Sequence, residues 1–255
     1  MATVDADPVI TADEDFNDGD SSLGGDTATS TESLRSSILG YRHENGRTYH
    51  RYRDGKYNLP NDSEEKERLD LQHHLCLLTF DNKLGFCPPN LPGSNAINFG
   101  DEHPEAEVVG VDLSPSQPNM VPPNVQFIID DIDEDWTYSK PFDYIHSRMM
   151  NFSVQNWPVY LQKIYDNLTP GGWVELQEVD VIMGCDDGTL SEDDTLAKWC
   201  KLLEEAATKL GRNFEKTSSF KGYLTDAGFT DIIETRFKWP TNRWPKDPKY
   251  KELGA

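Results

Sequence analysis

Short apolar runs alternate with amphipathic stretches from about residue 104 onward. The apolar runs predict strands over residues 107–112, 125–129, 142–146 and 173–179. Helical spacing of apolar residues predicts helices over residues 157–168, 193–210 and 216–227, and an extended stretch follows over 229–239. Strands that alternate with helices of about 10–15 residues are typical of βαβ units. We therefore predict an α/β fold with a mostly parallel sheet and helices on both faces.

In two of the predicted helices, the spacing of apolar residues also predicts which side chains are buried. One begins after Asn61, where Asp62 and Glu65 have the spacing of a capping box, and its leucines predict one buried stripe: Leu71, Leu75 and Leu78. The helix over 193–210 is expected to bury Leu196, Cys200, Leu203, Ala207 and Leu210. His73 and His74 are adjacent on the first helix and point in different directions. They are therefore not expected to share a metal ion, and no metal site is predicted.

Charge and composition exclude several classes of protein. The 255 residues carry 45 Asp and Glu against 24 Lys and Arg, a net charge of −21, which argues against direct nucleic-acid binding. No apolar run approaches the roughly 18–20 residues of a membrane span, and the acidic start has no signal peptide. The four cysteines form no CxxC pair, so we expect a reduced intracellular protein, cytoplasmic or nuclear. Residues 1–35 are acidic and poor in large apolar residues, and we expect a disordered tail there, either a solubilising leader or a partner-binding segment.

Residues 41–60 interleave aromatic and basic side chains, which is unique in this chain. Such a segment can stack on bases or cover an anionic ligand. Its alternative role is structural, as a docked surface segment in which the tyrosines provide packing. The pattern leaves both interpretations open.

Acidic residues follow two of the predicted strands. Asp112 ends one strand, and its two oxygens match the vicinal hydroxyls of a ribose; the alternative is a helix cap or a turn. Asp130 and Asp131 follow the next strand. An acid at this position can accept a hydrogen bond from the amine of adenine; the alternative is one more solvated charge. Ligands of parallel sheets bind at the carboxyl ends of the strands, so both positions are candidate sites. Pro170-Gly171-Gly172 predicts a tight turn that needs a positive φ.

Several of these segments together resemble class I S-adenosylmethionine-dependent methyltransferases, and they lie at residues 107–115, 125–131, 142–149 and 168–178. Further segments are similar to the fungal TAM-domain methyltransferases, the group that contains the LaeA-like regulators of secondary metabolism, and they lie at residues 41–50, 59–62 and 244–248. The resemblance covers about residues 36–253. It implies one domain over 36–255, with an N-terminal cap and helix at 36–83 and a Rossmann-like core at 84–255.

The resemblance also implies a cofactor and its ligands. S-adenosyl-L-methionine would lie across the carboxyl edge of a seven-strand sheet, with Asp112 on the ribose hydroxyls and Asp131 and Ile132 beside the adenine. Leu113 and Tyr52 are also expected to bind the cofactor, with the segment over 41–57 as a cap on the site. The implied partner is a small-molecule or protein methyl acceptor, and a regulatory protein partner stays open. No catalytic base is implied, because binding and orienting the donor supplies most of the catalysis in many such enzymes.

One departure from the family concerns its first motif, a strand that ends in a glycine-rich loop. The corresponding region, residues 84–100, contains Pro88, Pro89 and Pro92, and proline is excluded from a central strand. One strand and its loop are therefore expected to be missing, and the chain stops at Ala255, where the family normally continues. We expect weak cofactor binding and impaired activity.

Two other classes remain as alternatives. A non-catalytic interaction protein would use the methyltransferase fold without its cofactor loop. An NAD-dependent oxidoreductase would share the sheet and the ribose-binding acid. However, the only Tyr-x-x-x-Lys pair, Tyr52 and Lys56, precedes the nucleotide-binding half, which is the wrong order for a short-chain dehydrogenase.

Overall fold

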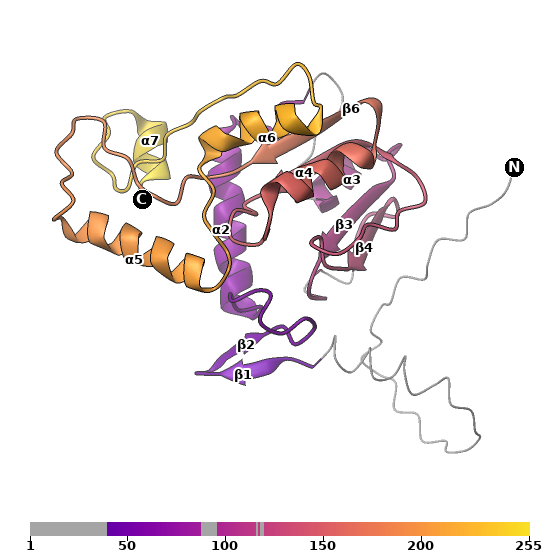
Figure 1. Ribbon diagram of the computed structural model, residues 1–255, viewed down its shortest axis with the longest axis horizontal. Coiled ribbons are helices and arrows are strands. Elements are labelled where there is room, and N and C mark those ends of the chain that lie inside the picture. Colours follow the sequence, from indigo (N-terminus) through magenta and orange to yellow (C-terminus); the bar gives the residue numbers. More distant parts are fainter. Residues whose placement is uncertain (1–39, 88–95, 116, 118–119) are drawn as a thin grey trace, which may run out of the picture. The chain divides into compact units, whose positions relative to one another are not determined.

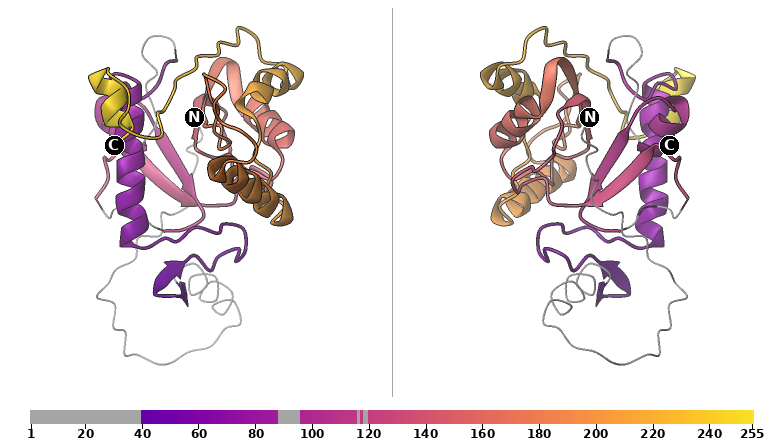
Figure 2. Two further views of the ribbon diagram at one scale, coloured as in Figure 1. Left: turned by 90° about the vertical axis from the view of Figure 1, so that its left-hand side faces the viewer. Right: turned by 90° about the vertical axis from the view of Figure 1, so that its right-hand side faces the viewer.

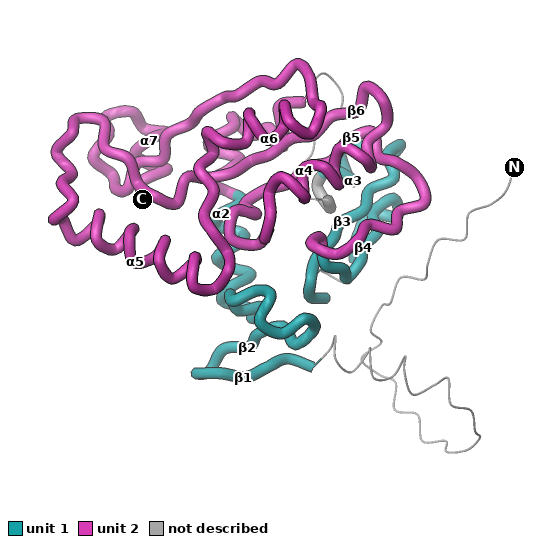
Figure 3. The backbone as a smooth tube through the Cα atoms, in the orientation of Figure 1, with its two compact units in different colours: residues 1–73, 95–131 teal, residues 74–94, 132–255 magenta. Residues whose placement is uncertain are grey.

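The computed structural model describes residues 40–87, 96–115, 117 and 120–255 (Figure 1). The acidic tail predicted for residues 1–35 and the prolines at positions 88, 89 and 92 lie outside these residues. The chain divides into two compact units (Figure 3). Unit 1 contains Met1–His73 and Asn95–Asp131, and unit 2 contains His74–Ser94 and Ile132–Ala255.

Unit 1 holds two small sheets. Strands β1 (Arg42–Glu44) and β2 (Arg47–Tyr49) form an antiparallel hairpin whose turn residues, Asn45 and Gly46, both have positive φ angles of 51° and 79°. Asn-Gly is the usual pair for such a turn, because both residues tolerate the left-handed region. Strands β3 (Val108–Asp112) and β4 (Val125–Ile129) are parallel and pair Asp112 with Ile129. Helix α3 (Ala96–Glu102) packs against this pair of strands.

Helix α2 (Ser63–Thr79) begins where the sequence predicts. The Asp62 side chain accepts a hydrogen bond from the backbone N–H of Glu65 at 3.1 Å, which confirms Asp62 as the helix cap. The predicted leucine stripe is wrong at Leu71, which is 59% exposed, whereas Leu75 and Leu78 are half-buried; the buried positions in this part of the helix are Cys76 and Thr79. Leucines occur on more than one face of this helix, so their spacing does not define its orientation.

Unit 2 is built on the parallel pair β5 (Phe142–Arg148) and β6 (Leu168–Gln177). Helices α4 (Trp157–Asp166) and α6 (Phe220–Ala227) lie side by side in the figures and share the main core (Figures 1 and 2). The core side chains are Val154, Trp157, Tyr160, Leu161, Ile164 and Phe220. Ile145 of β5 and Val174 and Leu176 of β6 pack against them, so one face of this sheet is apolar.

The remaining elements of unit 2 are α5 (Thr195–Lys209), the short 3₁₀ helix η1 (Thr217–Ser219) and α7 (Pro248–Leu253). The burial predicted for α5 is confirmed at Cys200 and Ala207, but it is wrong at Leu196 and Leu210, which are 38% and 56% exposed. Those two residues stand at the ends of the helix, where fewer neighbours cover a side chain. The extended stretch predicted over 229–239 forms no strand in the structure.

The turn predicted at Pro170-Gly171-Gly172 lies inside β6 instead of before it. Phe142 pairs with Leu168 and Tyr144 pairs with Trp173, so residues 169–172 of β6 lie opposite the single residue Asp143 of β5 and form a bulge with three extra residues. Gly171 has a φ of 85° in this bulge, which confirms the positive φ. The strand therefore begins at Leu168, five residues before the predicted start.

The topology gives the α/β class that the sequence predicts, with parallel pairs and helices. The seven-strand sheet implied by the resemblance is not formed by the described residues, which contain three two-stranded sheets: β1–β2, β3–β4 and β5–β6. β3 pairs only with β4 and β5 only with β6 among these residues. The prediction that one strand and its loop are missing concerns residues 84–100, of which residues 88–95 lie outside the described chain.

Candidate cofactor site

Asp112 is the last residue of β3 and lies at the carboxyl edge of the β3–β4 sheet. Its Oδ1 accepts a hydrogen bond from the backbone N–H of Ser114 at 3.0 Å, so the turn role considered from the sequence is present. The side chain retains solvent access, while crowding by protein atoms raises the pKa of the carboxyl group and the backbone hydrogen bonds oppose this shift. One carboxylate oxygen thus supports the turn, and the group keeps acceptor capacity for a ligand. The next residue, Leu113, is half-buried.

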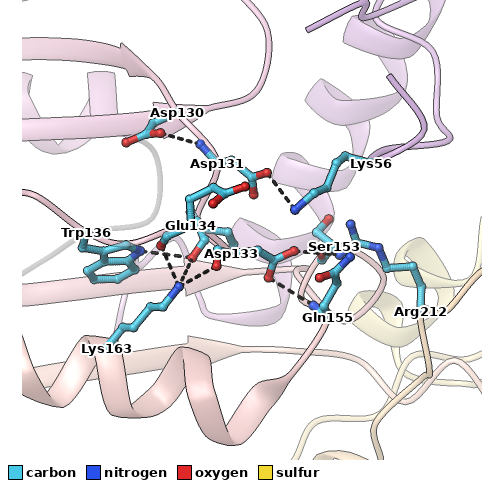
Figure 4. Close-up of polar contacts among 11 residues, drawn as sticks. Lys56, Asp130, Asp131, Asp133, Glu134, Trp136, Ser153, Gln155, Lys163 and Arg212 are labelled. Atoms are coloured by element: carbon cyan, nitrogen blue, oxygen red, sulfur yellow. Dashed lines mark hydrogen bonds and ion pairs between the residues drawn. The ribbon is translucent and has the colours of Figure 1, made fainter. Parts of the chain in front are cut away.

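Asp131 follows β4 at the same edge, since the backbone N–H of Asp130 donates to the Asp112 carbonyl at 2.9 Å. The Asp131 side chain is buried, and its Oδ2 lies 2.8 Å from Nζ of Lys56 (Figure 4). Its backbone N–H donates to Oδ1 of Asp130 at 2.8 Å. Asp131 is therefore not a solvated charge, and its ion pair connects the N-terminal segment to the end of β4.

The N-terminal segment is fixed to the start of α2 by a second ion pair. Arg47 binds the Asp62 carboxylate with two nitrogens, at 2.5 Å from Nε to Oδ2 and 2.7 Å from Nη2 to Oδ1. This contact lowers the pKa of Asp62. Thr48 adds a hydrogen bond from its Oγ1 to Oδ1 of Asn61 at 2.9 Å, and the Asn61 N–H donates back to the Thr48 carbonyl at 2.8 Å. The N-terminal segment is thus held at two points: β2 is bound to the start of α2, and Lys56 is bound to Asp131.

Three side chains of this segment lie near the two acids. Lys56 contacts Asp131, and the ring of the next residue, Tyr57, lies 6.0 Å from the ring of His50. The negative charge of Asp112 favours the protonated forms of both His50 and Tyr57, and so contributes a rise to the pKa of each. Burial raises the pKa of Tyr57 to about 12, so its hydroxyl stays protonated. The sequence pointed to this segment as a cap but did not single out His50, Lys56 or Tyr57 as site residues.

Two other predicted cofactor ligands, Tyr52 and Ile132, have surroundings of a different kind. Tyr52 is half-buried, and its ring lies 5.8 Å from Cζ of Arg53. Ile132 belongs to unit 2, where its side chain packs on the α4 core and its carbonyl accepts from Nε1 of Trp136 at 3.1 Å. Their roles toward the cofactor stay predictions.

In unit 2, the acidic run after Ile132 is held by two cations (Figure 4). Nζ of Lys163 donates to the carbonyl oxygens of Asp133 at 2.7 Å and Glu134 at 2.6 Å. The buried guanidinium of Arg212 lies 3.0 Å from Oδ2 of Asp133 and also donates to the Ser153 carbonyl. This part of the acidic run is structural, because it attaches the loop after β4 to α4 and to the segment that follows α5.

The carboxyl edge of β5–β6 contains a third polar group. Glu178 follows β6 and accepts the backbone N–H groups of Met150 at 2.8 Å and Asn151 at 3.1 Å. Burial raises the pKa of Glu178 to about 8. Asn151 is buried and binds both backbone groups of Glu215. Met149, before this loop, has a φ of 54°, an uncommon value for a residue with a side chain.

The opposite face of β5–β6 carries polar residues around Glu175. Its Oε2 accepts the backbone N–H groups of Phe86 at 2.8 Å and Cys87 at 3.1 Å, and the hydroxyl of Tyr144 at 3.2 Å. His146 lies nearby, and burial lowers its pKa to about 4, so the ring is neutral at pH 7. Residues 84–87 are thus anchored on this sheet, immediately before the residues where the glycine loop was expected, which lie outside the described chain.

The described residues lack two other kinds of feature. They contain no group of three or more His, Cys, Asp or Glu side chains placed to hold a metal ion. No helix among them is long and apolar enough to cross a membrane. All four cysteines of the chain are free thiols.

The acid at the end of β3 and the second acid after the parallel strand β4 lie at the carboxyl ends of the strands, where open α/β sheets bind their ligands. A family model described as a methyltransferase domain matches residues 92–234. The chain belongs to this methyltransferase family. The resemblance found from the sequence is thereby confirmed, together with S-adenosyl-L-methionine as the cofactor that accompanies it.

Two proteins of similar sequence come from fungi. Methyltransferase pytC of Aspergillus terreus is 40% identical over 242 residues, which cover 90% of this chain and 75% of pytC. The secondary metabolism regulator LAE1 of Cochliobolus heterostrophus is 39% identical over 228 residues, 83% of this chain and 74% of LAE1. Among solved structures, the N-methyltransferase NodS of Bradyrhizobium japonicum with S-adenosyl-L-homocysteine has a TM-score of 0.32 at 13% identity, covering 76% of this chain and 84% of NodS.

Proposed function

We propose that this chain is a methyltransferase that binds S-adenosyl-L-methionine at the carboxyl edge of β3–β4 and acts in secondary metabolism. The observation that carries the proposal is the pair of acids, Asp112 and Asp131, at one sheet edge, with Lys56 of the capping segment bound to Asp131 at 2.8 Å. The fungal relatives, one named a methyltransferase and one a secondary metabolism regulator, support the metabolic setting. The methyl acceptor is a small molecule or a protein.

The cofactor would supply an electrophilic methyl group, and the protein would bind and orient it. Asp112 offers acceptors for ribose hydroxyls, with Leu113 and Tyr52 as further predicted contacts. Lys56 already binds one carboxylate oxygen of Asp131. Asp131 would therefore accept a hydrogen bond from the adenine amine while it stays paired with Lys56. A carboxylate has about four acceptor positions, so both partners can be accommodated. Ile132 is proposed to flank the adenine, as the resemblance implies.

We propose further that the activity of this chain is impaired. The sequence places three prolines where the family has its glycine-rich loop, and β3 and β5 each have one neighbouring strand among the described residues. The backbone N–H groups of that loop approach the methionine end of the cofactor in the family. Without them, the chain would hold the nucleoside half more firmly than the methyl group.

Isothermal titration calorimetry with S-adenosyl-L-methionine, S-adenosyl-L-homocysteine and NAD tests the first proposal. We expect the two adenosyl ligands to bind and NAD to be weaker. Asp112→Ala should lower the affinity about 10- to 150-fold, the effect of losing a charge-assisted hydrogen bond of about 1.5–3 kcal/mol. Asp101→Ala, which removes an exposed acid of α3 in the same unit, is the matched control. Binding of none of the three ligands would favour a non-catalytic interaction protein.

A graft tests the impairment. A Val-Leu-Asp-x-Gly-x-Gly-x-Gly segment inserted between Asn90 and Ala96 should increase both cofactor affinity and methyl transfer, measured beside the unchanged chain at equal solubility. If the unchanged chain binds at micromolar affinity and turns over as fast as the graft, the proposed impairment is wrong. A regulatory protein partner is the function to pursue if neither chain transfers a methyl group.

We also propose a cytoplasmic or nuclear location and a single domain over residues 36–255. The four free thiols support a reducing compartment, because oxidising compartments favour disulfides. Imaging of a fluorescent fusion distinguishes the two locations, and limited proteolysis tests the domain boundary.

A further inference from the structure

His50, which is not among the predicted site residues, has an unusual environment for a histidine. It follows β2 directly, and its side chain is 3% exposed. Its Nε2 is buried and has no hydrogen-bond partner among the described residues. Buried polar atoms are normally hydrogen-bonded, so an unpaired ring nitrogen needs an explanation.

The chemistry of the ring follows from its other nitrogen. The side chain makes a hydrogen bond to the backbone of Arg53 that favours the charged ring, as expected when Nδ1–H donates to a carbonyl oxygen. Burial is the larger effect and lowers the pKa of His50, so the ring is neutral at pH 7. In a neutral ring with the proton on Nδ1, Nε2 is a hydrogen-bond acceptor. A ligand group that binds this atom must therefore donate a hydrogen bond to it.

The neighbours of His50 lie at the edge that holds the candidate cofactor acids. Its ring faces Tyr57 at 6.0 Å, and the adjacent Lys56 binds Asp131 at 2.8 Å. The negative charge of Asp112 favours the protonated ring and thus opposes part of the effect of burial on the pKa of His50. All these residues belong to unit 1. The edge thus has two acceptors, the Asp112 carboxylate and Nε2 of His50, and two acceptors suit a ligand with two neighbouring hydroxyl donors.

We propose that His50 is a further nucleoside-binding residue, whose Nε2 accepts a hydrogen bond from one ribose hydroxyl while Asp112 accepts one from the other. This inference rests on the proposed cofactor binding and adds a residue that would recognise the ribose. It predicts that the protein distinguishes ribose from deoxyribose through two separate side chains. A histidine that only packs against Tyr57 would show no such dependence on the sugar.

The test uses calorimetry with adenosine, 2′-deoxyadenosine, 3′-deoxyadenosine and S-adenosyl-L-homocysteine. His50→Phe retains an aromatic ring beside Tyr57 and removes Nε2, and His50→Gln supplies an amide oxygen as a replacement acceptor. His43→Phe, at an exposed histidine of β1, is the matched control. Thermal unfolding of each variant establishes that it folds.

His50→Phe should weaken adenosine and S-adenosyl-L-homocysteine about 2- to 12-fold, the loss of one neutral hydrogen bond. It should leave unchanged the affinity for the one deoxyadenosine that lacks the hydroxyl bound by His50. Asp112→Asn should reduce discrimination against the other deoxyadenosine, His50→Gln should recover part of the loss, and His43→Phe should match the wild type.

Three results would overturn the assignment. One is an unchanged adenosine affinity in folded His50→Phe, and another is an equal loss for all three nucleosides, which indicates packing only. If His50→Phe does not fold, His50→Gln takes its place in the test. A His50→Gln protein that discriminates between adenosine and the two deoxyadenosines to the same degree as the wild type does would then contradict the assignment. If wild-type protein binds none of the four ligands, the proposed function itself is wrong and this inference falls with it. Wild-type binding with no effect of His50 rejects only the inference.

Discussion

Replacing Lys56 with methionine removes the cation paired with a carboxylate that has almost no solvent contact. The side chain of Asp131 is 3% exposed, that of Lys56 is 22% exposed, and the two charged atoms are 2.8 Å apart. Methionine keeps most of the aliphatic length of lysine without the charge, so the change isolates the ion pair.

The magnitude follows from the burial of the two partners. Removing one partner of a fully buried pair costs about 3–5 kcal/mol, because the other charge remains buried and uncompensated. Solvent reaches part of Lys56 and screens the interaction, so we expect a smaller loss, about 1–3 kcal/mol. The double variant Lys56→Met/Asp131→Asn should regain at least half of this loss, since it removes the buried charge together with its partner.

The assay must report on unit 1. All six tryptophans lie at residue 136 or later and therefore in unit 2, so tryptophan fluorescence does not monitor unit 1 directly. Hydrogen exchange followed by mass spectrometry does, through peptides that cover residues 41–57 and 108–131. Lys56→Met should accelerate exchange in both peptides. Lys66→Met, at an exposed lysine of α2, should leave both unchanged.

Two outcomes would contradict the reasoning. Unchanged protection in Lys56→Met would mean that the ion pair contributes nothing to holding the segment at the end of β4. A double variant as unstable as the sum of the two single variants would mean that Lys56 and Asp131 do not interact energetically.

Three further predictions concern unit 2. Burial raises the pKa of Glu178 from its usual 4.5 to about 8, so the folded state keeps a proton that the unfolded state releases, and stability should fall as the pH rises from about 4.5 to about 8. Urea unfolding monitored by tryptophan fluorescence should show this slope, and Glu178→Gln should flatten it; an equal slope in both proteins would refute the shift. Burial also raises the pKa of Cys87 to about 12, so iodoacetamide should modify the exposed Cys185 well before Cys87, and mass spectrometry showing the reverse order would contradict this. Leu161→Ala should destabilise unit 2 by about 2–5 kcal/mol in urea unfolding, because Leu161 is 0% exposed, whereas Val159→Ala on the same helix, at 50% exposure, should cost much less.

Local pattern was sufficient for most of the helices and strands. β3, β4 and α4 lie where the apolar spacing predicts them, and Asp62 caps α2 as its position in the sequence indicates. Burial was predicted less well, because the leucines of α2 do not mark a single face and the exposed leucines Leu196 and Leu210 lie at the ends of α5. The boundary of β6 was missed because its bulge contains residues that usually end a strand, Pro170 and Gly171.

The sequence by itself determined the α/β class, the family and the position of Asp112 at the end of a strand. These depend on local periodicity and on motifs of neighbouring residues, which are visible in a one-dimensional pattern. Only the tertiary structure decided which side chains meet there: Lys56 with Asp131, His50 with Tyr57, and, in unit 2, Arg212 with Asp133. Charged residues are frequent in this chain, and nothing local distinguishes a lysine that will be paired from one that will be solvated. The partner is set by chain folding over tens of residues, and burial then makes that pairing energetically important.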